Sequence, residues 1–242
     1  MSIVHRFARC LVAGGLLVAG CSATPVAVER ESTTSTSTTA PIAPPPTAGE
    51  LRARVRGIGT DPSPDDVLLV GDSVMVLVTD DIATHLSSEL HIDAADCRRI
   101  DQAIEGPCGG VPAGTVVADG VEALADQAAS LAAEGIFPEV AVVILANNSS
   151  VSAADLDDAM AAIPGIDRVW WVTTRIVGFG RQDPNNRELE ALARRDARAR
   201  VIDWFLASEG QDWLADNVHP NDAGQRALGR LIAYHVACDC IP

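Results

Sequence analysis

The sequence predicts an α/β domain in which a parallel sheet of about five strands is covered by helices on both faces. Short continuous apolar runs of strand length recur along the chain, and longer stretches with helical spacing lie between them. The chain has 242 residues, of which 48% are hydrophobic, enough for one sizeable core. Because strands that alternate with helices are joined by crossovers, we expect them to be parallel and buried on both faces.

The first part of the chain, residues 1–20, has the pattern of a secretory signal. A basic start containing Arg6 and Arg9 precedes an apolar run, residues 11–19, that is too short to span a bilayer. The run ends in Leu-Val-Ala-Gly-Cys, which resembles the bacterial lipoprotein signal, whose cysteine is acylated. We therefore expect an exported protein anchored through Cys21 to the outer face of the cytoplasmic membrane in the cell envelope, in preference to an ordinary cleaved signal with an incidental cysteine.

Residues 21–56 are expected to be the acylated cysteine followed by a disordered tether. This segment is rich in Ser, Thr, Pro and Ala, including an unbroken Ser/Thr run at 32–39 and three prolines at 44–46. Such a composition buries too little apolar surface to fold. The folded domain is therefore predicted to be residues 57–242, held away from the anchor by a semi-extended spacer.

The charge of the chain limits its partners. The formal net charge is -15. An acidic excess of this size argues against nucleic acid or an anionic lipid surface as the partner. Its simplest use is solubility, and we expect a monomer.

Five strands and five helices are expected in the folded part. The strand at 67–70 is a continuous apolar run that ends at Gly71, and the other strands are placed at 90–94, 140–145, 169–172 and 201–202. Helices are predicted at 75–86, 116–133, 153–162, 186–198 and 222–236.

Three polar clusters lie at the ends of these predicted elements. In a parallel sheet, function sits at the carboxyl ends of the strands, where loops lead into helices. The clusters are Gly71-Asp72-Ser73 after the first strand, Ala146-Asn147-Asn148 after the central strand, and Asp216-Asn217-Val218-His219-Pro220 before the last helix.

Ser73 is a candidate nucleophile. It follows a buried strand and precedes a helix, so its hydroxyl projects from the edge of the sheet while its own amide points into the site. Taken alone, Gly-Asp-Ser is equally an ordinary turn with a helix-capping residue.

His219 supplies the base that a serine hydroxyl needs at neutral pH. Asp216 lies three residues earlier and can orient the imidazole within the same turn. Pro220 then begins the last helix. The alternative for this segment is an exposed histidine beside a helix cap.

Together these two elements, in this order, resemble the SGNH (GDSL-type) hydrolase family, in the branch of exported domains that transfer or remove O-acetyl groups. The similarity covers about Val67 to the C-terminus. It implies a flavodoxin-like three-layer α/β/α sandwich, with Ser73 in the first conserved block and Asp216 and His219 completing a catalytic triad in the last.

The resemblance also implies an oxyanion hole. The segment Ile92-Asp93-Ala94 followed by Cys97 resembles the second block of the family, with Cys97 where a Gly or Ser is usual. The oxyanion donors are then the amides of Ser73 and Cys97 and the side chain of an asparagine in the third block. The family has Gly-x-Asn there; aligning Ala146 with the glycine favours Asn148 as the donor over Asn147.

Four cysteines remain in the folded part. In an exported protein disulfides are the first hypothesis and metal ligation the second. Cys97 and Cys108 bracket a short Gly- and Pro-rich segment and are the preferred pair, although the sequence allows other pairings with Cys238 and Cys240. No histidine spacing indicates a metal site, and no cofactor is expected.

The four tryptophans are candidates for sugar-binding platforms. Trp170 and Trp171 fall in a predicted strand and are expected in the core. Trp204 and Trp213 lie nearer the expected rim of the site, where core packing and substrate contact are equally open.

Further polar side chains are candidates for substrate contact. Arg98, Arg99 and Arg175 are expected to form ion pairs within an acidic protein rather than to hold a polar substrate. Asn185 and Asn186 stand where related acyltransferase domains carry a loop asparagine near the site.

The predicted function is that of an exported serine esterase or acyltransferase acting on O-acyl, mainly O-acetyl, groups of a cell-envelope glycan or similar small ester. Water as acceptor gives hydrolysis and a sugar hydroxyl gives transfer; both use the same residues. The alternative is an inactive lipoprotein that keeps the fold as a binding or structural module. Phosphoryl transfer ranks last, because no basic phosphate cradle is evident.

Overall fold

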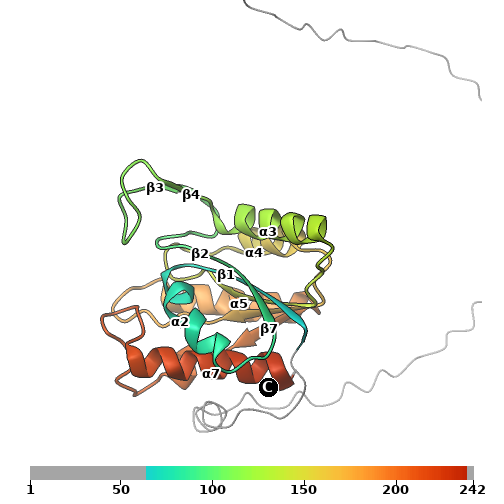
Figure 1. Ribbon diagram of the computed structural model, residues 1–242. Coiled ribbons are helices and arrows are strands. Elements are labelled where there is room, and N and C mark those ends of the chain that lie inside the picture. The colour runs from blue at the N-terminus through green and yellow to red at the C-terminus, as the bar shows by residue number, and fades with distance from the viewer. Residues whose placement is uncertain (1–63, 239–242) are drawn as a thin grey trace, which may run out of the picture. The chain divides into compact units, whose positions relative to one another are not determined.

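A computed structural model of the chain describes residues 64–238, and its main sheet has five parallel strands (Figure 1). The strand order is β2-β1-β5-β6-β7. All five predicted strands are present, so the predicted α/β class and strand number are confirmed. Their bounds are β1 Asp66–Gly71, β2 Glu89–Ala94, β5 Val140–Ile144, β6 Arg168–Val172 and β7 Ala199–Ile202.

The register of the central strands brings the predicted functional loops together. Gly71 at the end of β1 pairs with Ala94 of β2 on one side and with Ile144 of β5 on the other. The Asp72 amide then donates to the Ile144 carbonyl at 2.9 Å, which extends this contact past the strand. Three strands therefore end level with one another, and the loops that follow them leave from one edge of the sheet.

Helices cover both faces of the sheet and make a three-layer α/β/α sandwich (Figure 1). One face packs against α2 (Ser73–Ala83) and α7 (Asp222–Cys238), with the short α6 (Trp204–Ala207) beside them. The other face packs against helices whose bounds are α3 Gly120–Glu134, α4 Ala153–Ala162 and α5 Gln182–Arg195. Alternate residues of β1 enter opposite cores: Leu69 faces the first layer and Leu68 the second.

Local capping explains where several helices begin. Asp72 caps α2 by accepting a hydrogen bond from the Val74 amide at 2.9 Å, so this helix starts at Ser73 and not at the predicted residue 75. Asp119 caps α3 in the same way through the Glu122 amide. The α4 helix has a capping box between Ser152 and Asp155.

The prediction of a helix from residue 116 was wrong at its start. Val116–Val117 forms strand β4, which pairs antiparallel with β3 (Ile104–Glu105) in a small hairpin beside α3 (Figure 1). The helix begins only after the Asp119 cap. The helix predicted at 186–198 is α5 at Gln182–Arg195.

The predicted signal, the acylated Cys21, the tether and Cys240 all lie outside the described residues. Within residues 64–238 no helix is both long enough and apolar enough to span a membrane.

Candidate active site

Ser73 lies at the first position of α2, directly beyond the central strand β1. Gly71 permits this close turn, because a Cβ at that position would lie 2.2 Å from the Met75 Cβ. Ser73 is half-buried, and its Oγ lies 3.0 Å from Nε2 of His219. The structure therefore brings the predicted nucleophile and base within hydrogen-bonding distance of one another.

Asp216 and His219 share one tight turn before α7. Oδ2 of Asp216 lies 2.8 Å from Nδ1 of His219, and Oδ1 accepts hydrogen bonds from the amides of Val218 and His219, each at 2.7 Å. The Ala215 amide donates to the His219 carbonyl and closes the turn. One carboxylate thus both shapes the turn and orients the imidazole.

The charge of Asp216 is stabilised by these contacts. The hydrogen bond from the His219 side chain, followed by the backbone hydrogen bonds, lowers the pKa of Asp216 to about 2. The carboxylate is ionised near neutral pH, so it favours an imidazole that keeps a proton on Nδ1 and presents a bare Nε2 to the Ser73 hydroxyl.

Asn147 and Asn148 have different surroundings, although they are neighbours in the loop after β5. Asn147 is buried, and its side-chain amide donates to both carboxylate oxygens of Asp72, at 2.9 and 3.2 Å. Asn148 is half-buried and donates to the Arg98 carbonyl at 3.1 Å. That bond uses one of the two N–H groups of the Asn148 amide and leaves the other available.

The segment after β2 lies beside the same edge of the sheet. The Ala95 amide donates to the Gly71 carbonyl at 3.1 Å, which holds this segment next to the nucleophile turn. Cys97 follows two residues later with φ +62°, a left-handed conformation that glycine adopts at no steric cost. The resembled family has Gly or Ser at this position; glycine adopts this conformation freely, and the cysteine here adopts it as well.

The predicted disulfide between Cys97 and Cys108 is confirmed, with a Cα–Cα distance of 6.1 Å. It joins the segment after β2 to the loop that leads to β3. Asp96 contacts the same loop, since its carboxylate accepts a hydrogen bond from the Gly110 amide at 2.8 Å. Cys238 is also disulfide-bonded.

Two of the three arginines considered for substrate binding are occupied. Arg98 is buried and pairs with the Asp93 carboxylate at 2.6 Å, as the ion-pair prediction required, while Arg99 donates to the Gln102 side chain. Arg99 and Arg175 depart from the prediction, since neither pairs with a carboxylate within residues 64–238. The Arg175 guanidinium lies over the ring of Phe205, 5.3 Å from the ring centroid.

Asn185 and Asn186 are buried and hold loops of the site rather than facing a substrate. Asn185 accepts from the Val151 amide and donates to the carbonyls of Ala146 and Ser149. Asn186 bonds both the amide and the carbonyl of Thr174. Both lie in α5 and not in a loop, and their side chains bond the backbone of the loops after β5 and β6.

The tryptophans pack into the core. Trp170 and Trp171 are fully buried, as predicted. Trp204 is also buried, and its ring stacks on that of Trp213 at a centroid distance of 5.6 Å. Between the two alternatives for Trp204, core packing is the correct one.

Sequence reasoning missed the loop between β6 and α5, which lines a pocket of about 460 Å³ from Arg175 to Gly180 together with Gln182 and Asp183 at the start of α5. The Val177 amide donates to the Asn217 carbonyl at 2.7 Å, within the turn that carries Asp216 and His219. The sequence signal for this loop was the pair Gly178 and Gly180, which flank Phe179.

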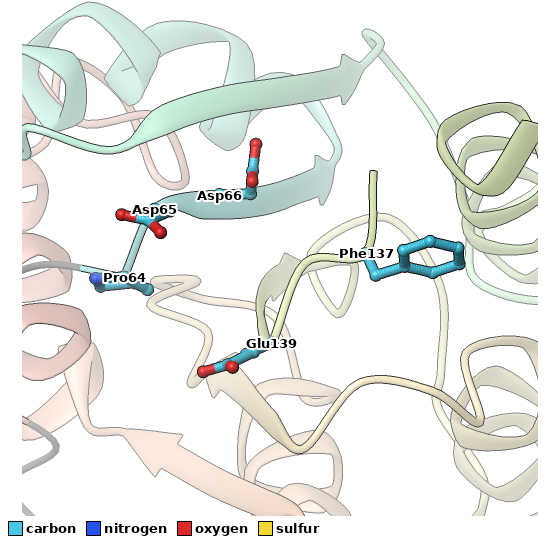
Figure 2. Close-up of a pocket in the computed structure, with 5 residues that line it drawn as sticks. All are labelled: Pro64, Asp65, Asp66, Phe137 and Glu139. Carbon is cyan, nitrogen blue, oxygen red and sulfur yellow. The ribbon is translucent and has the colours of Figure 1, made fainter. Parts of the chain in front are cut away.

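Another pocket lies at the opposite edge of the sheet. Figure 2 shows its lining residues, which come from the start of β1 and from the segment leading into β5: Pro64, Asp65, Asp66, Phe137 and Glu139.

Within residues 64–238 no group of three or more acidic, histidine or cysteine side chains is arranged to hold a metal ion.

Comparison with solved structures identifies the fold. A member of the lipolytic G-D-S-L family from Veillonella parvula DSM 2008 is similar at a TM-score of 0.51 and 14% identity, covering 69% of this chain and 94% of that chain. The C-terminal catalytic domain of Streptococcus pneumoniae peptidoglycan O-acetyltransferase A gives 0.49 and 16%, covering 71% and 92%. TesA gives 0.47 and 18%, covering 70% and 97%.

No family model and no curated protein sequence matches the chain. The likeness to the G-D-S-L structure shows that this chain has the fold of the SGNH hydrolases, as the resemblance in its sequence implied.

Proposed function

We propose that this chain is a serine esterase or acyltransferase whose nucleophile is Ser73. The observation that carries the proposal is the line of contacts from the Ser73 hydroxyl to Nε2 of His219 at 3.0 Å, and from Nδ1 to Asp216 at 2.8 Å. A hydroxyl next to a bare imidazole nitrogen, with an ionised carboxylate on the other side of the ring, is the arrangement that activates serine.

In the first step, Oγ of Ser73 attacks the carbonyl carbon of an ester while Nε2 of His219 takes the hydroxyl proton. The carbonyl oxygen becomes an oxyanion, and its proposed donors are the amides of Ser73 and Cys97 and the second N–H of the Asn148 side chain. His219 then gives its proton to the leaving alcohol as the C–O bond breaks. The product is an acyl group on Ser73.

In the second step, an acceptor hydroxyl attacks the acyl-enzyme and His219 takes its proton. The tetrahedral intermediate collapses, Ser73 leaves, and His219 returns the proton to Oγ. Water as the acceptor gives hydrolysis, and a sugar hydroxyl gives acyl transfer.

We further propose that the substrate is an O-acyl, mainly O-acetyl, ester of a cell-envelope glycan, and that Cys21 anchors the enzyme at that place. The support is the lipoprotein-like start of the sequence, the Ser-, Thr- and Pro-rich composition of the residues that follow it, and the similarity of the Ser73, Cys97 and His219 blocks to exported O-acetyl enzymes. Sharing a fold with a lipolytic G-D-S-L protein agrees with ester chemistry.

A fluorophosphonate probe tests the proposal. We expect the folded protein to form one adduct, on Ser73, detected by peptide mass spectrometry. Ser73→Ala must abolish the adduct, and His219→Ala should slow its formation severely. Absence of any Ser73 adduct would refute the enzyme and leave the alternative, a binding or structural module with this fold.

Aryl acetate turnover with and without glycan acceptors separates hydrolysis from transfer. Acetate release that is unaffected by an acceptor, with no acetylated glycan formed, would exclude the transferase.

A further inference from the structure

The loop after β6 is fastened to both halves of the proposed catalytic site. On one side, the Val177 amide donates to the Asn217 carbonyl at 2.7 Å, in the turn of Asp216 and His219. On the other side, the Arg181 guanidinium donates to the Asn147 carbonyl at 2.7 and 3.1 Å. The loop that lines this pocket is therefore held against the turn of Asp216 and His219 and against the loop after β5.

The loop is also braced internally. The Gln182 side chain accepts a hydrogen bond from the Ile176 amide at 2.7 Å, and Ile176 is buried. The Arg181 guanidinium lies over the ring of Phe179, 5.1 Å from its centroid. A pocket whose walls are held by such bonds is formed before a ligand arrives, which lowers the cost of ordering it on binding.

The pocket combines one positively charged side chain with exposed apolar side chains. Val177 and Phe179 are unusually exposed for their type, at 44% and 47%. Arg175, whose guanidinium rests on the Phe205 ring, keeps its N–H donors unused within the described part of the chain. The pocket also holds one carboxylate, that of Asp183, which accepts from the Gln182 side chain.

Arg175 has no carboxylate partner in the described part of the chain, although Asp and Glu outnumber Lys and Arg by 33 to 18 in the full sequence. It shares this with other arginines, such as Arg99 and Arg181, but those two donate hydrogen bonds elsewhere, and Arg175 is the arginine that lines this pocket. An arginine that faces a pocket without such a partner is available to bind an anion brought by a ligand.

We propose that this pocket is a substrate subsite in which Arg175 binds an anionic group, a carboxylate or a phosphate ester, carried by the sugar that bears the acyl group. The inference rests on the proposed function and names its substrate class, an acyl ester of an acidic saccharide. Val177 and Phe179 receive the apolar face of that sugar. A protein with a net charge of -15 repels polyanions at long range. We therefore expect a ligand with isolated acidic groups and not a densely charged polyanion.

The test compares three acetylated methyl glycosides that differ only in the exocyclic group of the sugar: a hydroxymethyl, a carboxylate and a phosphorylated hydroxymethyl. With the full-length protein, kcat/KM is expected to be about tenfold higher for one or both anionic esters than for the neutral ester, because a charge-assisted hydrogen bond contributes that much. The ester that gains identifies the anion.

Arg175→Gln is the decisive variant. It should remove the preference by raising KM for the anionic ester, so that anionic and neutral esters are turned over with similar kcat/KM. Arg194→Gln is the matched control, since Arg194 is exposed on α5 and pairs loosely with Glu190 at 3.9 Å. Equal preference in Arg175→Gln and the parent, or no preference in the parent, overturns the subsite.

Direct binding separates this inference from the proposed function. Titration calorimetry with the unacetylated acidic glycoside requires no turnover, and its affinity should fall about tenfold in Arg175→Gln. A protein that binds in this way but forms no Ser73 adduct has the subsite without the proposed catalysis. A protein with the adduct and no Arg175-dependent binding or preference has the catalysis without the subsite.

Discussion

Asp72 and Asn147 form a buried contact directly behind the proposed nucleophile. The Asp72 carboxylate is fully buried, and the Asn147 side chain donates to both of its oxygens at 2.9 and 3.2 Å. Because Asp72 also caps α2 through the Val74 amide, this contact joins the loop after β5 to the start of the helix that carries Ser73. The position of the nucleophile thus depends on a residue in another loop.

Asn147→Ala should lower the stability of the protein, whereas Asn148→Ala should lower its activity. Removing Asn147 leaves a buried carboxylate without its main partner, so the free energy of unfolding should fall by about 1–3 kcal/mol. Removing Asn148 takes away a proposed oxyanion donor, so kcat should fall by about a hundred- to thousandfold at nearly unchanged stability. Urea denaturation and aryl acetate turnover measure the two effects.

Asn148→Asp is the isosteric control for the second effect, because it keeps the size but removes both N–H donors. A variant at position 148 that retains full turnover would remove that residue from the oxyanion hole and point to Asn147 instead.

The Asp72 carboxyl should make stability depend on pH. Burial raises its pKa from 3.8 to about 6, only partly offset by the hydrogen bonds from Asn147 and Val74. The folded state therefore holds this proton more tightly than the unfolded chain, so the stability it contributes is complete below about pH 4 and is lost as pH rises through about 6. That loss amounts to about 3 kcal/mol.

Urea denaturation of the parent and Asp72→Asn across this range isolates the effect, since other titrating groups are common to both. The stability of the parent relative to the variant should fall between about pH 4 and 7. Parallel curves would show that Asp72 has no raised pKa.

Asp216→Asn should separate the two roles of Asp216. An asparagine still accepts the amides of Val218 and His219 through Oδ1, so the turn and the stability should be kept. Its amide then faces Nδ1 of His219 as a donor, which favours the wrong tautomer, and kcat should fall by about ten-thousandfold. Aryl acetate kinetics and thermal melting give the two readouts.

Asp216→Ala provides the comparison, because it removes both sets of bonds and should also lower the melting temperature. Equal turnover in Asp216→Asn and the parent would exclude the proposed orienting role.

The parts of the fold that the sequence predicted are those where a local pattern and the tertiary environment agree. The apolar run ending at Gly71 becomes the central strand because both faces of the sheet are buried. Val116 and Val117 are β-branched and favour a strand over a helix, and the Asp119 cap starts α3 only after them, so they lie in a hairpin. A two-residue strand has too little pattern to be recognised.

The residues of the proposed site also differ in how far the sequence could predict them. Ser73, Asp216 and His219 could be grouped from sequence because their turn chemistry and order along the chain are distinctive. Asn148 could be favoured over Asn147 only through the alignment of Ala146 with a family glycine, since the directions of the two side chains depend on Asp72 and Arg98, which approach from other loops. Arg175 was misjudged because its lack of a carboxylate partner is visible only in three dimensions.

Replacing Cys97 tests whether its backbone conformation serves the oxyanion hole. In a Cys108→Ser background, Cys97→Gly and Cys97→Ala both lack the disulfide and differ only in how readily they adopt φ +62°. Glycine does so freely, whereas alanine pays about 1 kcal/mol, so the alanine form should be less stable by that amount. If the left-handed conformation aims the residue 97 amide at the oxyanion, kcat should also be higher in the glycine form. Equal kcat in two folded variants would exclude that amide as a donor that depends on this conformation.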